Sequence, residues 1–192
     1  MISWRENADE LRQILGRLEA TESSGRHLDP DEALNTWRDL TLEVRASGRT
    51  IYLIGNGASA SMASHVAADL AKNARVHTEV FTDLSLLTAI GNDLSFEEVF
   101  AEPLRRRMKQ AEMLVTISSS GDSPNVIKAA REAIRLGGQV ITLSAMKPEN
   151  KSRSLGRLNF YVPAQTYGWA ETCHAAILHF WVDQMVAATR MH

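Results

Sequence analysis

Short apolar runs alternate with helical segments from residue 51 onward, and this alternation constrains the fold more than any other feature. The apolar runs predict buried strands over residues 51–54, 77–81, 113–117, 140–143 and 160–162. The intervening segments predict helices over residues 60–72, 96–108, 124–136 and 168–188. Because the connections are short, the pattern favours an α/β fold: a doubly wound, mostly parallel five-stranded sheet flanked by helices.

Two helices are expected before the first strand. Trp4, Leu11, Leu15 and Leu18 recur at helical spacing and predict a helix over residues 3–19, and Asp29-Pro30 reads as the start of a helix that runs to Ala46. We predict that residues 1–48 contribute a helical pair for oligomerisation. Residues 49–192 form the α/β domain, and both parts make one compact unit.

The balance of charge argues against a nucleic-acid partner. The chain has 192 residues, with 21 Lys and Arg against 23 Asp and Glu, and its short basic run at 105–109 is interpreted as a solvated helix face. No apolar leader and no membrane span are expected. Cys173 is the only cysteine, so no intrachain disulfide can form, which fits a reducing cytoplasm.

A glycine loop follows the first strand of the alternating region. The sequence Gly55-Asn56-Gly57-Ala58-Ser59 joins this strand to a helix, where backbone N–H groups can bind an anion or a sugar. The spacing approaches a dinucleotide pattern, but no ribose-binding acid follows a second strand, so no nucleotide cofactor is expected. A tight turn without any ligand is the other reading of this loop.

A serine-rich loop follows the strand over residues 113–117. It contains Ser118, Ser119, Ser120 and Ser123, and Pro124 begins the next helix, with Ser123 expected as its N-cap. Hydroxyl donors beside the free N–H groups of a helix start suit a phosphate monoester. The alternative is an ordinary serine loop that supplies only a cap.

Histidines and carboxylates lie on two of the expected helices. His65 and Asp69 are four residues apart and share a helix face, whereas Glu171 and His179 are eight apart and about 12 Å separated if both are helical. These side chains suit a divalent metal or an acid–base pair. Asn92 and Asp93, expected in a loop after residues 86–90, could position sugar hydroxyls or form an ordinary turn.

Four motifs together resemble the sugar isomerase (SIS) domain family. They are GNGASASMASHVAADLA at 55–71, LTAIGNDLSFEEVF at 87–100, ISSSGDSPNVIKA at 117–129 and ETCHAAILH at 171–179. The resemblance runs from about residue 30 to the end of the sequence. It implies ketose–aldose isomerisation of a phosphosugar, here sedoheptulose 7-phosphate, by a cytoplasmic homotetramer with active sites at subunit junctions.

The resemblance also implies roles for individual residues. The serine loop would hold the phosphate, and Asn56, Gly57, Ala58 and Ser59 would line the sugar with Asn92 and Asp93. His65, Asp69, Glu171 and His179 match positions that bind zinc or another divalent metal, with Asp69, Glu171 and His179 as the acid–base groups. The family usually has glutamate at Asp69, glutamine at Glu171, and an Asp-Arg pair at Gly168 and Trp169.

A non-catalytic protein on the same scaffold is the competing hypothesis. Such a relative would bind a phosphosugar, or a replication-initiator protein through its oligomer surface. The presence of His65, Asp69, Glu171 and His179 favours the enzyme, whereas the shorter Asp69 side chain supports the alternative.

Overall fold

A central seven-stranded sheet organises the molecule in the computed structural model, which describes residues 2–190. The strand order is β2-β1-β7-β6-β5-β3-β4. The last five strands in this order are parallel, and each coincides with a predicted strand. They are β3 (Thr50–Gly55), β4 (His77–Val80), β5 (Met113–Ser118), β6 (Gln139–Ala145) and β7 (Leu158–Val162).

An antiparallel hairpin at one edge was not predicted. Strand β1 (Glu19–Glu22) pairs with β2 (His27–Leu28) and with β7. Helix α1 (Trp4–Gly16) therefore ends before Glu19, where the sequence pattern had continued it. The sheet thus has seven strands instead of five, because the hairpin extends the edge that β7 would otherwise leave unpaired.

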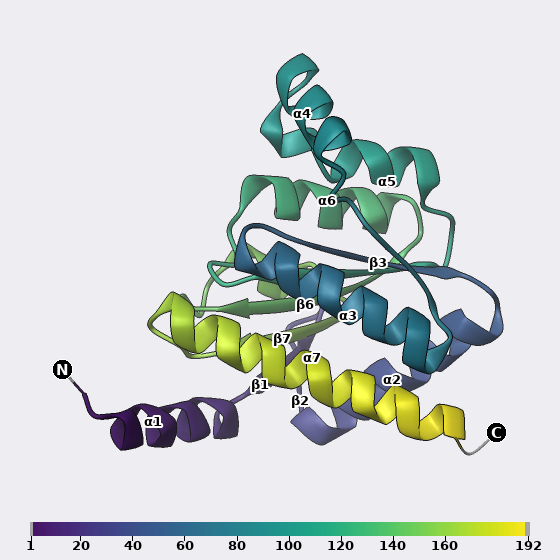
Figure 1. Ribbon diagram of the computed structural model, residues 1–192. Coiled ribbons are helices and arrows are strands. Elements are labelled where there is room, and N and C mark those ends of the chain that lie inside the picture. Colours follow the sequence, from purple (N-terminus) through teal and green to yellow (C-terminus); the bar gives the residue numbers. More distant parts are fainter. Residues whose placement is uncertain (1, 191–192) are drawn as a thin grey trace.

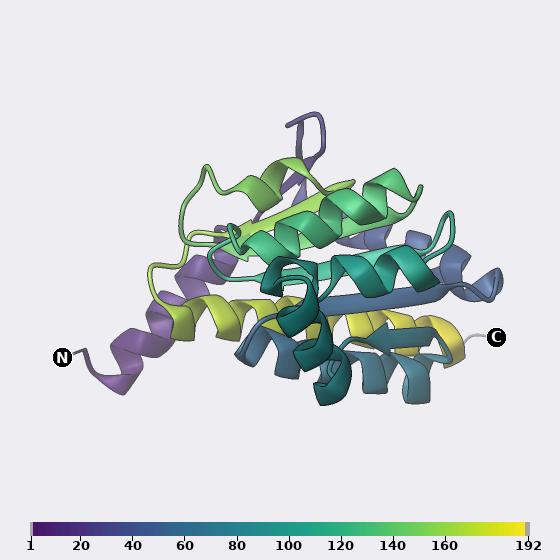
Figure 2. The ribbon, with the colours of Figure 1, turned by 90° about the horizontal axis from the view of Figure 1, so that it is seen from above.

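Helices cover both faces of the sheet (Figure 1). One face carries α2 (Pro30–Ala46), α3 (Ala58–Ala74) and α7 (Tyr167–Arg190). Figure 2 looks down on the other face, which α4 (Leu84–Asp93), α5 (Ala101–Arg107) and α6 (Pro124–Arg135) cover. Two short 3₁₀ turns, η1 (Phe96–Glu98) and η2 (Lys151–Ser154), lie in the connections. The helix predicted over residues 96–108 is therefore divided into η1 and α5.

Two hydrophobic cores separate the sheet from its helices. Along β3, Ile51 and Leu53 point into the core under α3 and α7, and Tyr52 and Ile54 point into the other. Burial on both faces explains why the strands read as continuous apolar runs. In the first core Trp37 of α2 stacks on Trp181 of α7, with ring centroids 4.1 Å apart. The N-terminal segment therefore shares a core with the α/β region.

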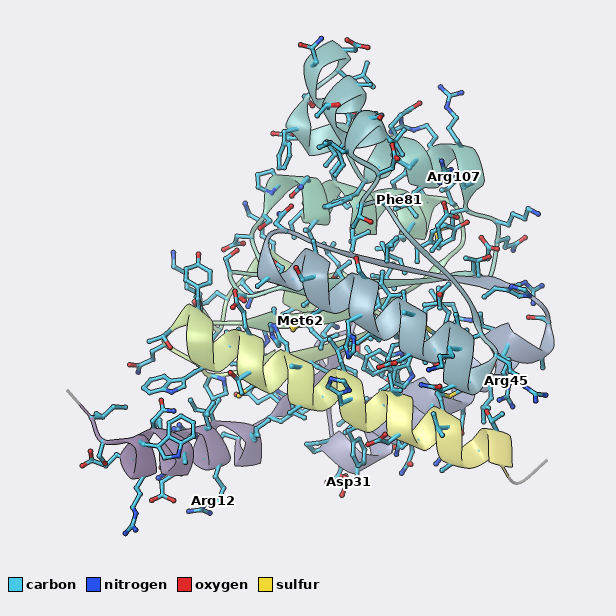
Figure 3. The ribbon with its side chains drawn as sticks, in the orientation of Figure 1. Arg12, Asp31, Arg45, Met62, Phe81 and Arg107 are labelled. Atoms are coloured by element: carbon cyan, nitrogen blue, oxygen red, sulfur yellow. The ribbon has the colours of Figure 1, made fainter. Side chains whose placement is uncertain are left out.

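Surface charges on the α5–α6 side are paired. Arg105 and Arg106 both form ion pairs with Glu102, and Arg107 pairs with Glu79. Arg107 also lies over the ring of Phe81, 5.7 Å from its centroid (Figure 3). The three arginines of the basic run therefore lie exposed on α5 as expected, whereas Met108 is buried just after the helix ends. Within residues 2–190, no helix combines the length and apolar character that crossing a membrane requires.

The sheet reverses its winding between β3 and β5. Helix α3 leaves β3 and covers one face, whereas α6 leaves β5, the neighbouring strand, and covers the other. The loops after these two strands therefore diverge at the carboxyl edge of the sheet. In open α/β sheets this reversal creates the crevice in which ligands bind.

Candidate functional site

The glycine loop and the serine loop line one pocket at this reversal point. The cavity measures about 160 Å³. The glycine loop contributes Asn56 and Ser59, and the start of α7 contributes Tyr167 and Glu171. The remaining lining comes from Ile117, Ser118, Ser119, Ser120 and Ser123. The structure therefore joins the two loops that the sequence had suggested separately.

Two glycines explain the path of the first loop. A Cβ atom on Gly55 would lie 2.8 Å from the carbonyl oxygen of Ile117, so glycine lets this loop approach β5. Gly57 has a φ of +56° and precedes α3 directly. Gly57 lines a neighbouring, mostly apolar cavity under Phe96 and Phe100, and Ala58 is exposed at the first position of α3.

The serine hydroxyls differ in what they bind. The Oγ atom of Ser118 accepts a hydrogen bond from the N–H of Gly121 at 3.2 Å, and that of Ser120 accepts one from the N–H of Asp122 at 3.3 Å. Ser123 occupies the N-cap position of α6 as predicted, but its hydroxyl makes no capping hydrogen bond to the described residues. Within the described residues, the buried Oγ of Ser119 has no hydrogen-bond partner.

The connection between β6 and β7 fixes the serine loop from behind. The hydroxyl of Ser152 donates to the carbonyl of Gly121 at 2.9 Å, and the N–H of Lys151 donates to Asp122 at 3.0 Å. Gly121 has a φ of +66°, and a Cβ atom there would lie 2.0 Å from Oδ1 of Asn150. These contacts hold the loop in one conformation before any ligand binds.

The electrostatics of the pocket come from dipoles more than from charged groups. Among the described residues, its lining contains no lysine or arginine, and Glu171 is its one charged side chain. The start of α6 adjoins the loop, and its free N–H groups carry partial positive charge. Hydroxyl donors and a helix start can together hold an anion.

A second group lies farther along α3 and α7, which pack side by side (Figure 1). Ligand atoms of His65, Asp69 and His179 lie within 4.8 Å of one another. The rings of His65 and His179 have centroids 5.3 Å apart. Both histidines are exposed and Asp69 is half-buried. This arrangement can hold a divalent cation and leaves ligand positions open toward solvent.

The structure does not bring Glu171 into this group. Glu171 precedes His179 by eight residues on the continuous helix α7, which separates them by about 12 Å along its axis. It lines the serine pocket instead. The predicted set of four metal ligands is therefore divided between two places within one chain.

Asn92 and Asp93 also lie away from the serine pocket. They end α4 and are exposed, and the amide of Asn92 donates to the carboxylate of Asp93 at 2.8 Å. Asp93 lines a groove between α4 and α5 with Arg106 and Arg107. The predicted loop is the last turn of a helix, and Figure 1 shows α4 projecting from the rest of the molecule.

One contact ties the far ends of α3 and α7 together. Arg45 of α2 donates to the carbonyl of Ala74 at 3.4 Å and to the hydroxyl of Thr189 at 2.5 Å. Arg45 is labelled in Figure 3, near these ends. The two helices that carry His65, Asp69 and His179 are thus held in register.

Two residues near the site were not proposed from the sequence. Tyr167 lines the pocket, and Asn125, at the start of α6, is buried beside the glycine loop. His174 is fully buried on the inner face of α7, where desolvation lowers its pKa from 6.5 to about 4. The signal for Asn125 was a polar residue on the otherwise apolar buried face of α6. On the same helix as His174, burial raises the pKa of the Cys173 thiol to about 11.

Comparison with known proteins links these features to one family. The model of the SIS domain matches residues 9–145, which include both loops and α3. A phosphoheptose isomerase from Helicobacter pylori (strain P12) is 32% identical over 178 residues, covering 90% of this chain and 91% of that protein. A phosphoheptose isomerase from Syntrophotalea carbinolica is 31% identical over 180 residues, covering 91% and 87%.

Solved structures agree with the sequence comparisons. The phosphoheptose isomerase GmhA from Neisseria gonorrhoeae superposes with a TM-score of 0.80 at 27% identity, and the match covers 93% of each chain. The family model matches from residue 9 to residue 145, whereas the resemblance was expected to run from about residue 30 to the end of the sequence.

Proposed function

Since the chain belongs to the SIS domain family, we propose that it is an aldose–ketose isomerase that converts sedoheptulose 7-phosphate into D-glycero-D-manno-heptose 7-phosphate. The relatives named phosphoheptose isomerase support this substrate. The two groups of polar residues along α3 and α7 support the reaction, since one suits the phosphate end of such a substrate and the other suits its carbonyl end.

The unpaired hydroxyl of Ser119 is the observation that carries the phosphate assignment. A buried hydroxyl without a partner costs free energy, and a phosphate oxygen in the pocket would accept its hydrogen bond. Ser118, Ser120 and Ser123 surround the same cavity. A phosphate monoester offers enough acceptor oxygens for these hydroxyls and for the start of α6.

The spacing along α3 suits a long substrate. His65 follows Ser59 by six residues, a rise of about 9 Å along the helix. That separation is comparable to an extended sugar phosphate that carries its phosphate at one end and its carbonyl at the other. A substrate bound in this way runs along the junction of α3 and α7.

The reaction needs a base and an acid at the carbonyl end. Asp69 removes the proton from the carbon beside the carbonyl and returns it to the former carbonyl carbon. His179 exchanges protons with the two sugar oxygens, so that one carbonyl is lost and the other forms. Glu171, also expected as an acid–base group, lines the phosphate pocket about 12 Å from His179, so it is too far away to act on the same carbon within one subunit.

A divalent metal fits the same exposed group on α3 and α7, as the alternative to its use as an acid–base pair. Two imidazoles and a carboxylate suit zinc, and His65, Asp69 and His179 would hold it. When bound, such an ion supplies charge stabilisation to an enediolate oxygen. Glu171 could join these ligands within one chain only if the first turns of α7 bent or unwound, because it lies about 12 Å from His179 along the helix.

We also propose a cytoplasmic homotetramer with active sites at subunit junctions. The exposure of His65 and His179 supports a second subunit over the carbonyl end. Trp4 and Leu84 are large apolar residues, 80% and 73% exposed, on the two helices that project in Figure 1. Contacts between subunits would cover such side chains, and residues 1–48 would contribute through α1.

An assay of the purified protein separates the enzyme from a non-catalytic protein. Sedoheptulose 7-phosphate is incubated with the protein, with and without zinc, and aldose formation is followed by NMR. We expect turnover, and Asp69→Asn and His179→Ala should each lose most of it while phosphosugar binding persists. Saturable binding without turnover would leave a phosphosugar-binding protein. The absence of both would remove the phosphosugar assignment and favour a protein partner such as a replication initiator.

A further inference from the structure

Asn56 and Asn125 form a reciprocal pair of amide hydrogen bonds across the candidate site. The Nδ2 atom of Asn56 donates to Oδ1 of Asn125 at 3.0 Å, and Nδ2 of Asn125 donates to Oδ1 of Asn56 at 2.9 Å. The two residues are 69 positions apart in the sequence. The pair joins the glycine loop directly to the first turn of α6, beside the serine loop.

A backbone contact at Asn125 fixes the orientation of both amides. The backbone N–H of Val126 donates to Oδ1 of Asn125 at 3.0 Å, so this atom must be the oxygen. Asn56 must then donate to that oxygen and accept from the neighbouring nitrogen. Asn125 is only 2% exposed and does not line the pocket, so it is shielded from competing water.

We propose that Asn125 is a positioning residue that sets the distance between the phosphate site and the start of α3. The inference rests on the proposed isomerase function. Helix α3 begins directly after the glycine loop and carries His65 and Asp69. Fixing that loop against the serine loop therefore fixes the acid–base groups relative to the phosphate.

The physical effect of this pair is preorganisation. A phosphate held by the serine loop aligns the carbonyl only if α3 starts at the correct distance. A misplacement of about 1 Å can reduce a rate by about 100-fold. In this pair Asn56 uses one of its own amide hydrogens and one lone pair of its own Oδ1, and it keeps one of each for the substrate.

Four variants test this role by steady-state kinetics. Asn125→Ala removes both bonds, and we expect kcat to fall between about 10-fold and 100-fold. The KM and the inhibition constant of inorganic phosphate should change little, because the serine hydroxyls remain. Asn125→Asp keeps an acceptor for Asn56 and Val126, so its kcat should be intermediate. Asn56→Ala should lower kcat similarly and should also raise KM, because it removes a side chain that lines the pocket. The double variant Asn56→Ala/Asn125→Ala should have the same kcat as Asn56→Ala, because the pair acts as a unit.

Asn159→Ala is the matched control. Asn159 is 1% exposed on β7 and makes four side-chain hydrogen bonds outside the pocket lining. The Asn159→Ala variant should have a lower thermal midpoint of unfolding, while its kcat stays near that of the original protein. All rates are compared at a temperature at which each variant is folded. An equal loss of kcat in Asn125→Ala and Asn159→Ala, or multiplying losses in the double variant, would overturn the positioning role.

Hydrogen–deuterium exchange gives a readout that does not depend on turnover. Asn125→Ala should exchange faster over residues 55–59, with residues 118–123 less affected. Unchanged exchange over residues 55–59 would contradict the inference. Turnover that is absent in the original protein would instead contradict the proposed function, and exchange would still decide the role of Asn125.

Discussion

The Nε2 atom of His65 lies 3.3 Å from Oδ2 of Asp69, one turn farther along α3. The His65 side chain is 61% exposed and that of Asp69 is 29% exposed. His179 reaches the same place from α7, so three potential ligands converge at the surface. Solvent or a neighbouring subunit therefore has direct access to the group.

Zinc binding should depend on this convergence. We expect isothermal titration calorimetry to detect zinc binding by the original protein, and His179→Ala to weaken it by at least about tenfold. The affinity should fall at acid pH, since imidazole must be neutral to bind a metal. His77→Ala is the control, because His77 lies on β4 outside the group. Equal zinc affinity in the two variants would show that His179 is not a ligand.

Removal of the Ser119 hydroxyl should weaken phosphosugar binding. Hydrogen bonds to charged groups contribute about 1.5–3 kcal/mol, so Ser119→Ala should raise the dissociation constant between about 10-fold and 100-fold. Ser144→Ala is a matched control, because that hydroxyl is also buried and unpaired among the described residues but does not line the pocket. Titration calorimetry with sedoheptulose 7-phosphate measures both. Similar affinities for the two variants would remove Ser119 from the phosphate site.

A side chain at Gly121 should disturb the serine loop. Gly121→Ala places a Cβ atom against Asn150 at a φ of +66°, and we expect a loss of about 1–3 kcal/mol in the free energy of unfolding. Phosphosugar affinity should fall with it. Gly16→Ala is the control, since no heavy atom lies within 4 Å of the added Cβ atom. Urea denaturation measures the free energy of unfolding, and titration calorimetry measures the phosphosugar affinity. If Gly121→Ala changed neither, the serine loop would not be held rigidly by Asn150.

Burial of His174 should make stability depend on pH. Its pKa is about 4 in the folded protein and 6.5 ordinarily, so unfolding takes up a proton between these values. The contribution to stability is complete above pH 6.5 and is lost as the pH falls toward 4, by about 3 kcal/mol. Urea denaturation at pH 7.5 and pH 5 should reveal about 2 kcal/mol of this loss, because pH 5 lies only about 1.5 units below the unfolded pKa. His174→Gln should reduce the difference, and an unchanged difference would rule out His174 as its source.

The sequence predicted the parallel strands well because burial on both faces leaves continuous apolar runs between glycines. It missed β1 and β2, since Glu19–Glu22 is short and mostly polar and its stability comes from pairing with β7. Leu18 continued the helical spacing past the true end of α1. Local patterns cannot reveal an edge strand that depends on a partner far away in the sequence.

The sequence indicated which residue types could form the candidate site, but it indicated only in part which of those residues lie together. The i, i+4 spacing correctly joined His65 to Asp69, and the strand-to-helix loops correctly indicated the serine pocket. The sequence did not indicate that Glu171 belongs with the serines. Asn125 escaped notice because its partner, Asn56, is brought to it only by the packing of β3 beside β5.

The burial of Cys173 offers an internal reporter of opening in α7. Its thiol is enclosed and its pKa is raised, so the folded protein should resist alkylation. Because it is the sole cysteine, each modified molecule records one exposure of that helix. The rate of thiol labelling would therefore measure how often the helix that carries Glu171 and His179 detaches from the sheet, without an engineered probe.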